Sequence, residues 1–110
     1  IYKPSPTLLY RFTASGQSAY TVNGPGLATN VSNAGLVFHR GFTYDLHNQA
    51  GGTHPLRIQS TSGLSGTEYT TAISGSNTGM QVITVPLDAP DTLYYQCTAH
   101  ADMNGTITVK

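Results

Sequence analysis

The sequence predicts an all-β protein, a β-sandwich of about eight short strands. Apolar and polar residues alternate over short stretches, which is the period of a strand with one buried face. Glycine, proline and asparagine separate these stretches, and the spacing of amphipathic helices is nearly absent. A chain of 110 residues is long enough for one sandwich core but not for two, so we expect residues 1–110 to form a single domain.

The first half of the chain contains four predicted strands. Two alternating stretches, Leu8–Thr13 and Ala19–Asn23, come first, and the second runs into the turn signal Asn23–Leu27. A short, mostly apolar stretch follows at Gly35–Phe38, and the alternation resumes at Phe42–His47. Strands this short and this closely spaced favour an antiparallel sandwich.

The second half contains four more strands and one long connection. The connection Thr61–Thr78 is rich in serine, threonine and glycine and has no clear period, and we expect one helical turn in it, near Glu68–Ile73. Met80 opens the strand that follows, and we expect this side chain to pack in the core. The predicted strands are Leu56–Ser60, Met80–Val85, Thr92–Cys97 and Thr106–Lys110.

Alternation within the strand Thr92–Cys97 orients its side chains. Leu93, Tyr95 and Cys97 share one face, because successive side chains of a strand point to opposite faces. Two of these three are large and apolar, so we assign this face to the core. We therefore expect Cys97 to be buried.

Composition restricts the partners and the compartment. Five basic and five acidic residues give a net charge of zero, so the sequence offers neither a basic stripe for nucleic acid nor an acidic patch. No apolar run approaches membrane-spanning length, and a single cysteine cannot form an internal disulfide. Low charge with abundant serine, threonine, asparagine and glycine suits a periplasmic or otherwise extracytoplasmic protein, either a monomer or a domain of a longer chain. The sequence shows no leader, so a signal peptide has been removed or was never encoded in it.

The most informative motif lies near the C-terminus, where the only cysteine, Cys97, is followed by His100 and then by Met103 at equal spacing. A thiolate, an imidazole and a thioether suit a soft ion such as Cu(I), and a His2Cys set with a weak axial methionine is typical of electron-transfer copper sites. Such a site needs a second histidine. His54 is the candidate, because it lies far upstream where a loop enters an alternating segment.

Each of these residues also has an ordinary explanation. A single cysteine is most often a small buried apolar residue, and a single methionine is most often core filler. The combined order of ligand types favours a metal site over these explanations. His39 precedes Arg-Gly and is expected in a turn, while His47 lies on the polar phase of its strand, so we expect neither to bind copper.

The C-terminal segment Tyr94–Val109 resembles the cupredoxin family, the small blue copper proteins of the plastocyanin, pseudoazurin and amicyanin type. The resemblance rests on an aromatic strand, Cys-x-x-His-x-x-Met, then x-Gly and a closing β-branched strand. The two-residue gap between His100 and Met103 is most similar to amicyanin. The resemblance implies a Greek-key β-sandwich and one type 1 copper ion, with His54, Cys97 and His100 as equatorial ligands and Met103 as the axial ligand.

The sequence departs from the family beside the first histidine. In most simple cupredoxins an asparagine follows this histidine, and its backbone N–H donates to the copper-bound sulfur. Here the residue is Pro55, which has no N–H. Amicyanin-like loops have proline two residues after the cysteine, whereas this chain has Ala99. We therefore expect the Ala99 N–H to donate a hydrogen bond to the sulfur of Cys97.

The segment after His54 also resembles the His-Pro-x-His-x-His motif of multicopper oxidases. Arg57 and Gln59 stand where that motif has its other two histidines. Gln96 and Thr98 likewise flank the cysteine in place of the histidines that lead to a trinuclear cluster. A second cysteine for a dinuclear CuA centre is absent from the sequence. We therefore expect no oxygen reduction, and a protein that is not an enzyme.

The resemblance implies a one-electron carrier that cycles between Cu(II) and Cu(I) and docks redox protein partners near His100. The expected docking rim consists of Ala99, Ala101 and parts of the loops Asn23–Leu27 and Ala50–Thr53. The alternative is a cupredoxin-like module of a larger surface, secreted or phage structural protein, with a structural or vestigial copper site. Copper trafficking is a third possibility, which a buried thiolate disfavours because it would release the metal slowly.

Overall fold

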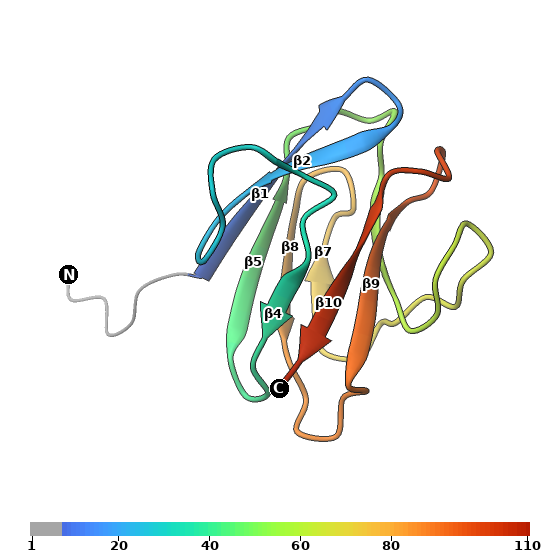
Figure 1. Cartoon of the computed structure of the whole chain (residues 1–110). Helices are drawn as coiled ribbons and strands as arrows, with labels where there is room; N and C mark the ends of the chain where they lie inside the picture. The colour runs from blue at the N-terminus through green and yellow to red at the C-terminus, as the bar shows by residue number, and fades with distance from the viewer. Residues whose placement is uncertain (1–7) are drawn as a thin grey trace.

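The computed structural model describes residues 8–110, which form ten strands and no helix in two sheets packed face to face (Figure 1). Within this range, therefore, no helix is long and apolar enough to cross a membrane. The fold is an all-β sandwich, as the sequence predicts. The strands are β1 (Leu8–Ser15), β2 (Ala19–Asn23), β3 (Val31–Ser32), β4 (Leu36–Phe38), β5 (Thr43–Asn48), β6 (Leu56–Gln59), β7 (Ile73–Gly75), β8 (Met80–Thr84), β9 (Thr92–Cys97) and β10 (Asn104–Val109).

The sheets contain six and four strands. The larger has the order β3-β2-β1-β5-β8-β7, and the smaller has the order β4-β10-β9-β6. Most neighbours are antiparallel, but β1 pairs with β5 and β4 pairs with β10 in parallel. The expectation of an antiparallel sandwich is therefore wrong for two of the pairs. Alternation within a strand determines which face is buried but carries no information about the direction of the neighbouring strand.

All eight predicted strands are present, each with ends within two residues of the prediction. The structure adds two short edge strands, β3 and β7. The helical turn expected near Glu68–Ile73 is wrong, because Glu68 forms a β-bridge with Gln59 and Ile73 begins β7. A positive φ of 59° at Ala72 places a bend directly before this strand. Segments this short contain too little alternation to be identified from the sequence.

The core lies between the two sheets and is rich in aromatic side chains. Phe12 packs edge-on against both Tyr20 and Tyr95, at ring-centroid distances of 5.8 and 5.2 Å. Further along the sandwich, Phe38 stacks on Tyr44 with centroids 4.1 Å apart. These rings come from both sheets, so they hold the two layers together.

Two expectations about individual side chains have different outcomes. Leu93, Tyr95 and Cys97 are all fully buried, which confirms the face of β9 assigned to the core. Met80 is 40% exposed, so the expectation that it packs in the core is wrong. In β8 the inward phase belongs to Gln81 and Ile83, which leaves Met80 on the outer face.

Three strand ends meet at one end of the sandwich. β5 ends at Asn48 and β9 ends at Cys97, while β6 begins at Leu56, which is paired with Cys97. In Figure 1 the green connection after β5 and the red turn between β9 and β10 both lie near the top of the view. The topology thus brings residues around position 54 beside residues around position 100.

Candidate metal centre

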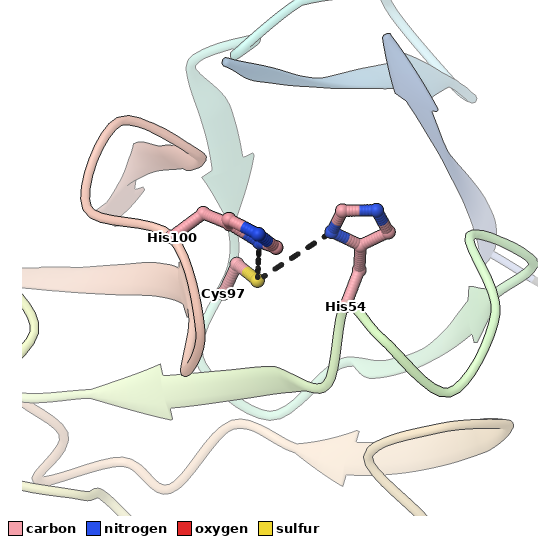
Figure 2. A group of neighbouring side chains, drawn as sticks. All are labelled: His54, Cys97 and His100. Carbon is pink, nitrogen blue, oxygen red and sulfur yellow. Dashed lines mark hydrogen bonds between the residues drawn. The ribbon is translucent and has the colours of Figure 1, made fainter. Parts of the chain in front are cut away.

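Three of the four predicted ligands come together at this end of the sandwich. The sulfur of Cys97 lies 3.4 Å from Nδ1 of His100 and 3.8 Å from Nδ1 of His54, as Figure 2 shows. The centroids of the two imidazole rings lie 4.8 Å apart, and the ring planes are tilted by 43°. All three potential ligand atoms lie within 4.8 Å of one another. Within residues 8–110, no other group of three or more histidine, cysteine, aspartate or glutamate side chains could hold a metal ion together.

These separations match donors that share one ion. Two donors that each bind a metal at about 2.0–2.3 Å, with angles between tetrahedral and trigonal, lie about 3.3–4.0 Å apart. The two sulfur–nitrogen distances, 3.4 and 3.8 Å, fall within this range. A thiolate with two imidazoles is also a donor set that suits copper and zinc better than harder cations.

Backbone hydrogen bonds fix Cys97 at the end of β9. Its N–H donates to the carbonyl of Met103 at 2.8 Å, which closes the turn between β9 and β10. The next N–H, from Thr98, donates to the carbonyl of Pro55 at 3.0 Å. This second bond joins the turn to the residue directly after His54. The sulfur and the first histidine therefore occupy adjoining, hydrogen-bonded segments.

Side-chain amides hold the turn that carries His100. Nε2 of Gln96 donates to the carbonyls of Cys97 and His100 at 2.9 and 3.0 Å. Nδ2 of Asn33 donates to the carbonyl of Asp102, and Nδ2 of Asn104 donates to that of Ala101, at 2.9 and 2.7 Å. Sequence reasoning missed all three amides. No pattern in the sequence reveals them, because each acts through contacts that only the folded chain creates.

Comparisons with known proteins identify the fold. No protein-family model and no curated protein matches the sequence. Among solved structures, the purple cupredoxin from Nitrosopumilus maritimus is 18% identical with a TM-score of 0.53, and the match covers 94% of this chain and 99% of that one. Rusticyanin from Thiobacillus ferrooxidans is 17% identical with a TM-score of 0.53, covering 94% and 76%. Reduced rusticyanin is 20% identical, also with a TM-score of 0.53, covering 94% and 78%.

The chain has the cupredoxin fold. At these identities the likeness concerns the fold alone. Cys97 is buried and lies near both His54 and His100, and the buried Met103 follows His100 by three residues. On the cupredoxin fold, this set of residues fits one type 1 copper site.

Met103, the fourth predicted ligand, is fully buried at the same end of this cupredoxin fold. The backbone of Met103 is hydrogen-bonded to that of the other two residues of the motif, Cys97 and His100. Its N–H donates to the carbonyl of His100 at 3.3 Å, and its carbonyl accepts the N–H of Cys97. The thioether of Met103 is a weak donor, as the axial ligand of a type 1 copper site is. Its role as axial ligand stays a prediction.

The sulfur of Cys97 makes no hydrogen bond with a backbone N–H in the described part of the chain; its side-chain neighbours are the two imidazole nitrogens and the hydroxyl of Tyr20. The bond expected from the Ala99 N–H is therefore not found. Ala99 is exposed in the turn. Pro55 has no N–H to donate, so on this cupredoxin fold neither side of the sulfur receives a backbone donor.

A buried phenol lies beside the site. Tyr20 is fully buried, and its hydroxyl donates to the backbone carbonyl of His54 at 2.8 Å. Burial raises the pKa of Tyr20 above its usual value, and electrostatic and hydrogen-bond interactions with the neighbouring Cys97 side chain raise it further. The phenol therefore stays protonated and neutral at physiological pH, so it acts as a hydrogen-bond donor.

The remaining histidines lie away from this cluster. His39 is exposed between β4 and β5, where its ring lies 5.7 Å from that of Phe42. His47 is half-buried in β5, opposite Met80 of the neighbouring strand. Neither belongs to the group formed by His54, Cys97 and His100.

The surface around the cluster differs in part from the predicted docking rim. His54 is 8% exposed, Cys97 is fully buried and His100 is partly exposed. Ala99 and Ala101 flank His100 and are exposed, and the loop Ala50–Thr53 leads directly into His54, so these parts of the rim lie at the site.

The loop Asn23–Leu27, in contrast, lies elsewhere. Pro25 accepts a hydrogen bond from the hydroxyl of Tyr10, and it lines a hollow together with His39 and Phe42. Phe42 precedes the first residue of β5, whereas the cluster lies beyond its last residue. The inclusion of this loop in the rim is therefore wrong, because the connection after β2 leaves toward the opposite end of the strands.

Proposed function

We propose that the chain is a type 1 copper protein that carries one electron at a time between protein partners. His54, Cys97 and His100 would be the equatorial ligands and Met103 the axial ligand. The observation that carries this proposal is the separation of the three buried or half-buried donors, 3.4 and 3.8 Å from sulfur to nitrogen, on a cupredoxin fold. Rusticyanin, which has the same fold, is described as a copper protein.

Copper in such a site supplies a reversible change between Cu(II) and Cu(I), while the protein fixes the ligands and tunes the potential. Here the ligands lie at strand ends and in a turn closed by backbone and amide hydrogen bonds. Rigid donors favour rapid electron transfer, because little of the coordination geometry has to change with the oxidation state. These properties support a carrier rather than an enzyme.

Exposure supports an electron exit at His100. The other three proposed ligands are buried, and His100 alone among them is partly open to solvent. The side chains next to it in the turn, Ala99 and Ala101, are small and leave its ring edge accessible. Small uncharged neighbours suit the brief contacts of redox partners. We further propose that the chain works as a single domain in a periplasmic or otherwise extracytoplasmic compartment.

The test is the addition of one equivalent of Cu(II) to the metal-free protein, followed by visible absorption and cyclic voltammetry. We expect an intense thiolate-to-copper band near ~600 nm that ascorbate bleaches and an oxidant restores, and a reversible one-electron wave. Cys97→Ala is the control and should lack the band.

Two other outcomes would contradict the proposal. Colourless binding, or no binding by the folded protein, would leave a vestigial site and favour a module of a larger structural protein. A coloured site without a reversible wave would favour a structural role for copper. Either result would remove the carrier function.

A further inference from the structure

The backbone carbonyl of His54 accepts two buried hydrogen bonds. One comes from the hydroxyl of Tyr20 and the other from Nδ2 of Asn48, both at 2.8 Å. The N–H of His54 donates to the carbonyl of Gly51 at 3.1 Å. Both polar backbone groups of this histidine are therefore bonded, and two of the three bonds involve side chains that the copper motif does not contain.

The two donors belong to the sheet opposite the one that His54 enters. Tyr20 lies in β2 and Asn48 ends β5, both in the six-stranded sheet, whereas the chain after His54 continues into β6 of the four-stranded sheet. The carbonyl of His54 is thus a hydrogen-bonded link between the layers. Displacement of this carbonyl would change the position of the imidazole relative to the sulfur of Cys97.

The side-chain amide of Asn48 is fixed by three hydrogen bonds. Besides the carbonyl of His54, Nδ2 donates to the carbonyl of Asn77 at 2.8 Å, and Oδ1 accepts the N–H of Ala50 at 2.9 Å. Both amide hydrogens and the oxygen are used, which determines the orientation of the group. Asn48 is 3% exposed, so water offers little replacement for these bonds.

Because Pro55 follows His54, the carbonyl of His54 is especially important for fixing the backbone at this position. Proline contributes no N–H, so the carbonyl oxygen is the one hydrogen-bonding group of the peptide unit between His54 and Pro55. A residue before proline is also restricted to extended backbone conformations. The two donors and the proline ring together leave the backbone of His54 little freedom.

We propose that Tyr20 and Asn48 are positioning residues for His54, and that they set its distance from the sulfur through the backbone carbonyl. The consequence for copper rests on the proposed function, but the hydrogen bonds do not require a metal. The proposal also gives Tyr20 a role beyond core packing. Its ring packs against Phe12 and Tyr95, which accounts for the ring but not for the direction of its hydroxyl.

The chain contains a matched control for the loss of this hydroxyl. Tyr95 is also fully buried in the same aromatic cluster, and its hydroxyl donates to the backbone carbonyl of Ala34 at 2.6 Å. Tyr20→Phe and Tyr95→Phe therefore each remove one buried phenol-to-carbonyl bond. Only Tyr20→Phe removes a bond to a proposed ligand residue.

The experiment compares the unaltered protein with these two variants in two states. In the metal-free state, we expect the carbonyl 13C signal of His54 and its imidazole signals to shift in Tyr20→Phe and to stay in place in Tyr95→Phe. In the copper-loaded state, we expect Tyr20→Phe to change the Cu(II) EPR hyperfine coupling and to bind Cu(II) about 10-fold more weakly. Tyr95→Phe should retain both properties. Both variants should lower the midpoint of urea unfolding by similar amounts.

Two results would overturn the proposal. The first is a set of unchanged His54 imidazole signals in metal-free Tyr20→Phe. The second is a copper spectrum and affinity of Tyr20→Phe equal to those of Tyr95→Phe. Should the unaltered protein bind no copper, the proposed function fails, but the metal-free imidazole signals still decide whether Tyr20 positions His54. Asn48→Ala provides a second perturbation and should shift the same His54 signals.

Discussion

Gln96 is the residue whose replacement tests most directly how the ligand turn is held. Its side chain is fully buried beside Cys97. Nε2 donates to the carbonyls of Cys97 and His100 at 2.9 and 3.0 Å, so one amide bonds the backbone of two proposed ligands. Its Oε1 is buried and has no hydrogen-bond partner among residues 8–110. The amide therefore acts on the turn as a donor only.

The perturbation is Gln96→Met, which keeps the length of the side chain and removes both polar atoms. Loss of the two shorter hydrogen bonds, one buried and one half-buried, costs about 1–1.5 kcal/mol each, and removal of the unpartnered oxygen recovers about 1 kcal/mol. The third contact of Nε2, to the carbonyl of Ala101 at 3.4 Å, is longer and adds little. The net loss in the free energy of unfolding is about 1–2 kcal/mol. For a domain of this size the melting temperature should fall by about 4–8 °C.

Gln59→Met is the matched control, because Gln59 is equally buried and lies away from the ligands. Its Nε2 donates to the carbonyls of Thr61 and Gly63 at 2.9 and 2.8 Å. Both variants should melt earlier in the metal-free state. Only Gln96→Met should accelerate hydrogen exchange at the Met103 amide, which bonds the carbonyl of His100, and weaken Cu(II) binding about 10-fold.

The reasoning would be refuted by either of two results. An unchanged melting temperature of Gln96→Met would show that its two hydrogen bonds contribute nothing net to stability. Equal copper affinities and equal exchange of the turn amides in Gln96→Met and Gln59→Met would show that the amide of Gln96 stabilises the fold without positioning the ligands.

Three further variants test other parts of the site and its support. Cys97→Ala should abolish the thiolate-to-copper absorption band while circular dichroism shows an intact fold; a remaining band would contradict the ligand assignment. Met103→Gln should retain copper and shift the reduction potential measured by voltammetry, because the axial ligand tunes that potential; an unchanged potential would argue against Met103 as a ligand. Gly105→Ala should destabilise the protein by about 1–3 kcal/mol in urea unfolding, since its added Cβ would collide with the Tyr95 ring, whereas Gly52→Ala meets no neighbouring atom and should cost less.

The proposed ligand motif could be recognised in the sequence because its spacing is local. Cys97, His100 and Met103 lie within seven residues, so their order indicates a candidate ligand set without knowledge of the fold. His54 required one further step, a remote histidine at the start of a strand, and the structure places it 3.8 Å from the sulfur. Strand alternation likewise predicted the buried face of β9, because period two is a property of the strand alone.

The residues that support the motif were not predictable. Tyr20 is separated from His54 by 34 positions, and its strand pattern identifies a core aromatic without giving the direction of its hydroxyl. Gln96 lies on the face of β9 opposite Cys97, where alternation predicts exposure, yet it is fully buried. Its burial follows from the turn that folds back over its amide. The prediction for Met80 was wrong for a related reason. Only the folded structure shows which alternate residues of β8 face the core.

The two proposed histidine ligands are held in different ways, and the difference bears on the route by which an electron could enter or leave the site. The carbonyl of His54 is bonded from the opposite sheet by Tyr20 and Asn48, and its side chain is 8% exposed. His100 lies in a turn whose carbonyls are bonded by side-chain amides such as that of Gln96, and the residue is partly exposed. A partly exposed ligand gives a structural copper site no advantage, whereas it shortens the path of an electron to a partner protein. The asymmetry between the two histidines therefore favours the carrier.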